Sequence, residues 1–141
     1  MNGHQLPQAA FQFGGQLAGI VMNEPLVLLP GMMCDARIFA PQIFALSTDM
    51  AVMTAPITGG ERIEEIASQI LSLAPAKFAL AGLSMGGIVA LEIVRRAPER
   101  ITRLALMDTS PLAETPQEAA AREPQIVGAR AGRMLEVIRD Q

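Results

Sequence analysis

Apolar and polar residues alternate along this chain in blocks that predict strands and helices in turn. Four short apolar runs are typical of strands in a covered sheet: residues 26–29, 50–53, 78–81 and 101–107. Three longer patterns with helical spacing lie between or beside them: residues 41–46, 61–73 and 85–97. Pro75 and Pro98 stand just after the last two, where proline ends a helix.

This alternation of strands and helices predicts an α/β fold with a mostly parallel sheet and helices on both of its faces. In such sheets ligands bind beyond the carboxyl ends of the strands. Met32, Ser84 and Asp108 each follow a predicted strand at that end. We therefore expect three separate segments of the chain to meet at one edge of the sheet.

The two ends of the chain give weaker patterns. Gly14-Gly15 lies between short mixed runs, so residues 1–24 are compatible with a hairpin or with a loose arm. Thr115 and Pro116 form a good helix start, and helical composition continues to residue 140. We expect this helix to be broken or kinked at Pro124 and again near Gly132, with no strand after it.

Composition limits the classes of function. Of 141 residues, 50% are hydrophobic and 18% charged, which allows a packed core. A net charge of −3 without Trp or Tyr argues against a nucleic-acid partner. The single cysteine, Cys34, excludes an intrachain disulfide and, with one histidine, a zinc site; we expect it to be a small apolar filler. With neither a signal-peptide pattern nor an apolar run of membrane length, we expect a cytoplasmic protein without a membrane partner.

The segment Gly82-Leu83-Ser84-Met85-Gly86 carries the chemistry. It stands where a predicted strand stops and a predicted helix starts, which is the context of a nucleophile elbow. Gly82 and Gly86 suit a turn too tight for flanking side chains. The turn presents the Ser84 hydroxyl at the start of a helix, where the helix dipole and free N–H groups favour developing negative charge.

A serine nucleophile needs donors for the oxyanion that forms on the substrate. The elbow supplies one, the backbone N–H of Met85, and the loop after the first strand supplies the other. In that loop Gly31 allows the backbone to turn, so we expect the Met32 N–H to face Ser84. Taken alone, Pro30-Gly31 indicates only a plain turn. Because it is expected on the same edge of the sheet as the elbow, we favour an oxyanion role for the Met32 N–H.

Three motifs together resemble the α/β-hydrolase superfamily, over roughly residues 25–112. They are Leu28-Leu29-Pro30-Gly31 followed by Asp35, then Gly82-Leu83-Ser84-Met85-Gly86-Gly87, then Leu104-Ala105-Leu106-Met107-Asp108-Thr109-Ser110-Pro111. The group that the chain resembles contains lid-bearing esterases, enol-lactonases and proline-iminopeptidase-like enzymes. The resemblance implies that residues 1–112 form the N-terminal part of the core and that residues 113–141 begin a helical lid.

The same resemblance implies a serine hydrolase that cleaves an ester, lactone or related acyl bond of a small molecule through an acyl-enzyme at Ser84. Met32 and Met85 would be the oxyanion donors, and neither a metal nor an organic cofactor is needed. Many relatives carry histidine at the position of Pro30. Serine rather than aspartate at the elbow argues against a dehalogenase-type mechanism.

The catalytic base is missing from the expected place. In this fold the acid and then a histidine follow the nucleophile, but the only histidine of this chain is His4. We expect His4 to be solvated and Asp108 to shape the pocket or to act as the acid. The chain therefore reads as a fragment that is truncated before the C-terminal strands and inactive alone, with an open sheet edge that favours self-association. A non-catalytic binding or scaffolding protein, or half of a split enzyme, are the alternatives.

Overall fold

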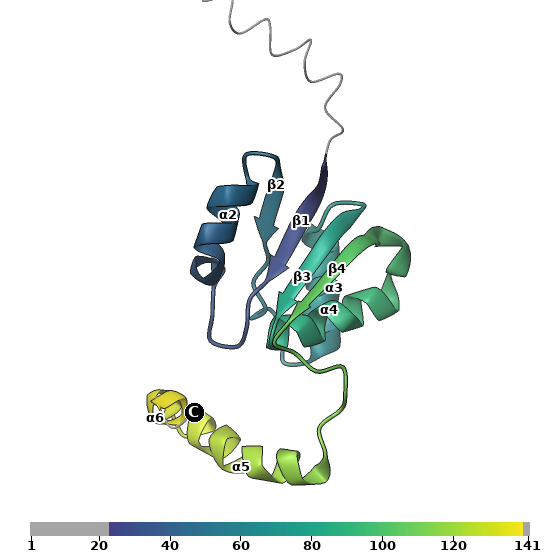
Figure 1. Ribbon diagram of the computed structural model, residues 1–141. Coiled ribbons are helices and arrows are strands. Elements are labelled where there is room, and N and C mark those ends of the chain that lie inside the picture. Colours follow the sequence, from purple (N-terminus) through teal and green to yellow (C-terminus); the bar gives the residue numbers. More distant parts are fainter. Residues whose placement is uncertain (1–22, 140–141) are drawn as a thin grey trace, which may run out of the picture. The chain divides into compact units, whose positions relative to one another are not determined.

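The fold is that of a computed structural model, which describes residues 23–139 (Figure 1). Four strands form its sheet: β1 (Asn23–Leu29), β2 (Met50–Thr54), β3 (Phe78–Leu83) and β4 (Ile101–Met107). Each of the four predicted strands is confirmed, and β3 runs two residues further than its apolar run. The hairpin or arm considered for residues 1–24 lies outside the described residues except for Asn23 and Glu24, which open β1.

The sheet has the strand order β2-β1-β3-β4, and every pairing is parallel. Leu29 at the end of β1 is in register with Gly82 of β3, and Gly82 is in register with Leu106 of β4. The chain leaves β1 toward β2 on one side and then continues to β3 on the other. The order of strands thus changes direction between β1 and β3, where ligands bind in open α/β sheets.

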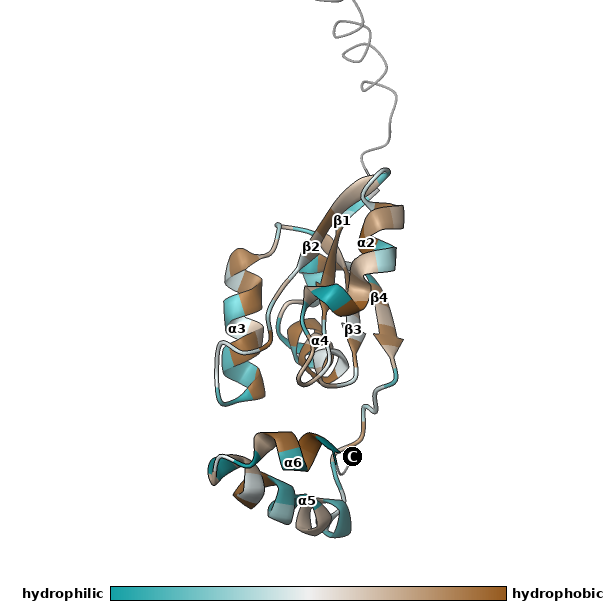
Figure 2. Cartoon of the chain, turned by 90° about the vertical axis from the view of Figure 1, so that its left-hand side faces the viewer, coloured by the Kyte–Doolittle hydropathy of each residue, from teal (hydrophilic) through white to brown (hydrophobic). Residues whose placement is uncertain are grey.

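Helices cover both faces of the sheet, as predicted. Figure 2 shows α3 (Ile63–Leu73) and α2 (Ala40–Leu46) on opposite sides of the strands. Along β1, Val27 and Leu29 pack into the core cluster on the side of α3 and α4 (Met85–Arg96). Leu28 packs into the opposite cluster, with Phe39 from the short 3-10 helix η1 (Ala36–Phe39). The alternating contacts of β1 explain its unbroken apolar sequence.

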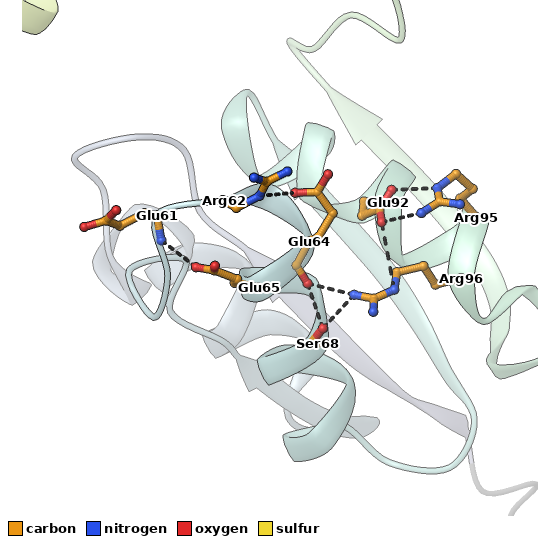
Figure 3. Close-up of polar contacts among 8 residues, drawn as sticks. All are labelled: Glu61, Arg62, Glu64, Glu65, Ser68, Glu92, Arg95 and Arg96. Atoms are coloured by element: carbon orange, nitrogen blue, oxygen red, sulfur yellow. Dashed lines mark hydrogen bonds and ion pairs between the residues drawn. The ribbon is translucent and has the colours of Figure 1, made fainter.

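Arginine side chains tie α3 to its neighbours. The Arg96 guanidinium on α4 donates to the Glu64 carbonyl at 2.7 Å and to the Ser68 hydroxyl at 2.6 Å, both on α3 (Figure 3). At the other end of α3, Arg100 donates to the Leu71 carbonyl at 2.9 Å. Its guanidinium also lies 5.6 Å from the centre of the Phe78 ring at the start of β3. These contacts hold α3 against α4 and β3.

The helix α4 is less buried than its composition indicates. Its apolar sequence is continuous enough to predict burial nearly all round, and its small residues Gly86, Gly87 and Ala90 are indeed buried. Ile88, however, is 45% exposed, so one side of the helix faces away from the core. An apolar sequence gives burial on the covered face only, because a helix beside a sheet packs with one side.

The chain divides into two compact units between Thr109 and Ser110. The second unit contains α5 (Pro116–Arg130) and α6 (Met134–Arg139). The Thr115 hydroxyl accepts a hydrogen bond from the Glu118 N–H, while the Glu118 carboxylate accepts from the Thr115 N–H, forming a capping box. We expect a break or a kink at Pro124; the break is wrong, because α5 continues through this residue. The predicted break near Gly132 is confirmed: its φ is +79°, and α6 starts two residues later.

The strand β4 forms one edge of the described sheet. It pairs with β3 on one side, and no other strand among residues 23–139 pairs with it. Leu104 and Leu106 on β4 are 42% and 40% exposed. Backbone groups on the open side of β4 and the exposed leucines form a surface that a second copy of the chain could pair with. We therefore predict self-association through this edge.

Candidate active site

The nucleophile elbow has the predicted context. The strand β3 ends at Leu83 and α4 starts at Met85, so Ser84 alone makes the turn. Its backbone has φ 50° and ψ −117°, a conformation that residues other than glycine adopt rarely, and the residue is exposed. A strained, exposed serine between a strand and a helix is the arrangement that makes a hydroxyl accessible to substrate.

At two positions of the elbow, Gly82 and Gly86, there is no room for a side chain. A Cβ atom on Gly82 would lie 2.4 Å from the carbonyl oxygen of Gly86. A Cβ atom on Gly86 would lie 2.3 Å from the carbonyl oxygen of Leu29. Both obstacles are backbone atoms, which cannot swing away as a flexible side chain does. The first turn of α4 is thereby seated directly on the end of β1.

The loop after β1 lies beside Ser84. A Cβ atom on Gly31 would be 3.5 Å from the Cβ atom of Ser84, an ordinary contact distance. A tight turn follows, closed by a hydrogen bond of 3.1 Å from the Cys34 N–H to the Gly31 carbonyl. The residue with positive φ in this turn is Met33, at 62°, whereas Gly31 has a φ outside that range.

Two backbone N–H groups are available near Ser84. Met85 is the first residue of α4, so its N–H has no partner within the helix. Met32 lies in the adjacent loop, and neither N–H donates to any group in residues 23–139. The start of a helix adds a partial positive charge. The oxyanion role of Met32 and Met85 remains a prediction that this arrangement supports.

The end of β4 holds the elbow from the other side. The Ser84 N–H donates to the Met107 carbonyl at 2.8 Å, and the Thr109 hydroxyl donates to the Ser84 carbonyl at 2.9 Å. Asp108 stands between these two contacts with φ 46° and is exposed. Its carboxylate accepts no hydrogen bond from the described part of the chain. The sequence motif contained Thr109 but gave no sign of its contact with Ser84.

Among residues 23–139 no histidine is available to act as a base beside Ser84. Residues 23–139 contain no histidine, and His4 lies outside the described residues. Over the same range no three side chains of His, Cys, Asp or Glu gather as metal ligands would. The region that the structure describes therefore presents the exposed Ser84 and two N–H groups without a partner, and it contains no histidine that could act as a base.

Comparisons with known proteins give the chain its relatives. No family model matches the sequence. It is 34% identical, over 112 residues, to a pimeloyl-[acyl-carrier protein] methyl ester esterase of Aromatoleum aromaticum, covering 73% of this chain and 45% of that protein. The enzyme of the same name from Vibrio parahaemolyticus is 29% identical over 119 residues, covering 79% of this chain and 47% of that protein.

A thermophilic esterase from Thermogutta terrifontis, solved with malate bound, has a similar structure. The TM-score is 0.64 at 28% identity, and the match covers 79% of this chain and 46% of that one. The chain belongs to the α/β-hydrolase superfamily. It spans about half of the length of the curated relatives that it matches, 47% and 45% for the two esterases above.

A cavity of about 320 Å³ lies at the carboxyl ends of β1 and β2. It is lined by Pro30, Cys34, Asp35, Ala36, Thr54, Pro56, Ile57 and Thr58. Cys34, which we expected to fill a core, is half-buried in this wall and belongs to neither core cluster. Hydrogen bonds from the Arg37 side chain and N–H lower the pKa of Asp35 to about 2, so its carboxylate is charged at neutral pH.

None of the helices in the described region is long and apolar enough to cross a lipid bilayer.

Proposed function

We propose that Ser84 is the nucleophile of a hydrolase that cleaves a carboxylic ester or a related acyl bond. The observation that carries the proposal is the exposed Ser84 at φ 50° between β3 and α4, next to the loop that holds Met32. Relatives named as esterases support the same reaction class.

In the proposed mechanism the Ser84 oxygen attacks the carbonyl carbon of the substrate while a base takes the hydroxyl proton. The carbonyl oxygen becomes negative, and the N–H groups of Met32 and Met85 donate to it. Collapse of this intermediate breaks the bond to the leaving alcohol, which receives the proton from the base, and leaves an acyl-enzyme. Water then attacks the acyl carbon, releases the acid and restores the hydroxyl.

The base of this mechanism is assigned to a part of the protein outside residues 23–139, because those residues contain no histidine. Asp108 has two candidate roles. It follows directly on Met107, whose carbonyl accepts from the Ser84 N–H, so it is close enough in the chain to orient a base or to line the pocket. Its exposure fits either role.

The names of the two esterases described above suggest a class of substrate. These two enzymes, from Vibrio parahaemolyticus and Aromatoleum aromaticum, are named for a methyl ester of an acyl group on acyl carrier protein. We propose that this chain acts on methyl esters of acyl chains. Hydrolysis of a dicarboxylic acid monomethyl ester, compared with a bulky branched ester of the same acid, is the measurement that decides this point.

The absence of a histidine from residues 23–139 keeps two alternatives in view. If no base reaches Ser84 in the complete protein, the same fold is a binding or scaffolding protein, or one half of an enzyme whose base belongs to a second chain. Reactivity of Ser84 separates these from the hydrolase. A non-catalytic protein leaves Ser84 unreactive, and a split enzyme becomes reactive when the second chain is added.

Labelling with a fluorophosphonate probe tests the nucleophile. The longest natural polypeptide that contains this sequence should label, and Ser84→Ala should abolish labelling because the probe then has no activated oxygen. Ser72→Ala is the matched control, since Ser72 is also exposed but lies at the end of α3. Labelling that persists in the Ser84 variant would remove the assignment.

A further inference from the structure

Thr109 contacts the nucleophile elbow in two ways. Its hydroxyl donates to the Ser84 carbonyl at 2.9 Å. Its side chain also packs against Gly87 of α4, where an added Cβ atom would lie 2.5 Å from the Thr109 Cγ2 atom. One side chain from beyond β4 therefore holds the backbone on both sides of Met85.

We propose that Thr109 is a positioning residue for the nucleophile, fixing the backbone of Ser84 in the strained conformation that exposes its hydroxyl. The inference rests on the proposed function, in which Ser84 is the attacking group. The hydroxyl of Thr109 donates to the Ser84 carbonyl and not to the Ser84 hydroxyl, so it acts through the peptide group that follows Ser84.

The contacts of Ser84 show why this anchor is effective. On the N-terminal side, the Ser84 N–H donates to the Met107 carbonyl at 2.8 Å. On the C-terminal side, the Ser84 carbonyl accepts from the Gly87 N–H at 2.9 Å, from the Ile88 N–H at 3.3 Å and from the Thr109 hydroxyl. A change of ψ at Ser84 turns this carbonyl away from Thr109. The hydrogen bond therefore opposes relaxation of a residue whose φ is unfavourable for serine.

The methyl group of Thr109 limits movement in a second direction. Because Gly87 has no side chain, α4 approaches the Thr109 side chain closely. The first turn of α4 carries the Met85 N–H, so its position also decides where the oxyanion is bound. Loss of the hydroxyl removes the directional contact, whereas loss of the methyl group only loosens the packing.

Two variants separate these contributions. Thr109→Val keeps the branched shape and removes the hydroxyl, while Thr109→Ser keeps the hydroxyl and removes the methyl group. We expect Thr109→Val to lower the rate of fluorophosphonate labelling roughly 2- to 12-fold, the range that corresponds to one hydrogen bond. Thr109→Ser should remain closer to wild type.

Hydrogen–deuterium exchange of the same proteins gives a readout that does not depend on reactivity. In Thr109→Val the amides of residues 84–88 should exchange faster than in wild type, while amides of β1 and α3 keep their protection. Equal exchange at residues 84–88 in wild type and Thr109→Val would overturn the inference. Faster exchange spread evenly over the core would overturn it too, because Thr109 would then be a general stabilising residue.

The labelling result distinguishes the two proposals. Wild-type protein that never labels contradicts the proposed function, and the exchange comparison then still decides whether Thr109 holds the elbow. Wild-type protein that labels at the same rate as Thr109→Val contradicts the positioning role and leaves Ser84 as the nucleophile.

Discussion

At the scale of single residues, the glycines around Ser84 fall into two kinds. Gly82 and Gly86 have backbone atoms where a side chain would begin. Gly31 has ordinary space and a φ outside the positive range, although it lies in the loop beside Ser84. The elbow motif predicted the first two correctly. The positive φ of this turn is at Met33. A dipeptide sequence does not tell which residue of a turn takes that conformation.

Alanine substitutions at two of these sites should therefore differ. Gly86→Ala forces a Cβ atom to within 2.3 Å of the Leu29 carbonyl oxygen, and we expect the free energy of unfolding to fall by about 1–3 kcal/mol or more. Gly31→Ala, the matched control, should change it by less than about 1 kcal/mol. Urea denaturation of both variants measures the difference, and equal midpoints would contradict the packing described for Gly86.

The setting of Ser84 between a strand and a helix was predicted from the sequence, but its contact with Thr109 was not. A nucleophile elbow is a local motif, so its five residues and their setting are visible in the sequence. The hydrogen bond from Thr109 joins the ends of two different strands, and its existence depends on how β4 lies beside β3. Contacts of this kind follow from tertiary structure and not from spacing along the chain.

At the scale of elements, strands and helices were predicted better than their ends. β4 has the predicted bounds, while β3 continues through Gly82 and Leu83 because its partners β1 and β4 extend alongside it. The helix α5 passes Pro124, which removes one N–H of the helix but leaves its capping box and the other turns in place. Strand pairing thus set the end of β3, and the capping box set the start of α5, whereas composition alone left these bounds open.

The capping box of α5 predicts a pH dependence. The Thr115 N–H and hydroxyl, which donate to the Glu118 carboxylate, lower its pKa below the ordinary value of 4.5. A lowered pKa in the folded state means that this contribution is complete above pH 4.5 and is lost as the pH falls through the lowered value. We expect amide protection at the start of α5 to fall over that acidic range.

The variant Glu118→Gln is the control for this effect. Glutamine keeps an oxygen for the Thr115 N–H but does not titrate, so protection at residues 117–120 should no longer depend on pH in that window. Protection factors from hydrogen exchange, corrected for intrinsic rates, measure both proteins. An identical pH dependence in the two would show that Glu118 does not control the start of the helix.

At the scale of the molecule, the alternation of elements predicted a parallel sheet with two covered faces but not its strand order. The order β2-β1-β3-β4 places the loop after β1 next to Ser84, and it is this neighbourhood that makes Met32 a candidate donor. Strand order depends on packing among all elements at once, so apolar runs alone do not contain it.

The edge at β4 gives a prediction about the polypeptide 1–141 itself. We expect it to self-associate through this edge, and the double variant Leu104→Lys, Leu106→Lys should shift it toward monomer, because charge on an edge strand opposes pairing. Leu112→Lys is the control, since Leu112 is 80% exposed and lies outside the strand. Light scattering after size-exclusion chromatography reports the mass, and a monomeric wild-type polypeptide would contradict the prediction.

The central claim is that Ser84 carries the acyl group during turnover. The most direct test is to mix the longest natural form of the protein with a short-chain p-nitrophenyl ester, quench with acid within the first turnovers and map the acylated peptide by mass spectrometry. We expect the acyl mass on the peptide that contains Ser84 and no acyl mass on that peptide in Ser84→Ala. Continued ester turnover with Ser84 unmodified, or the acyl group on another residue, would contradict it.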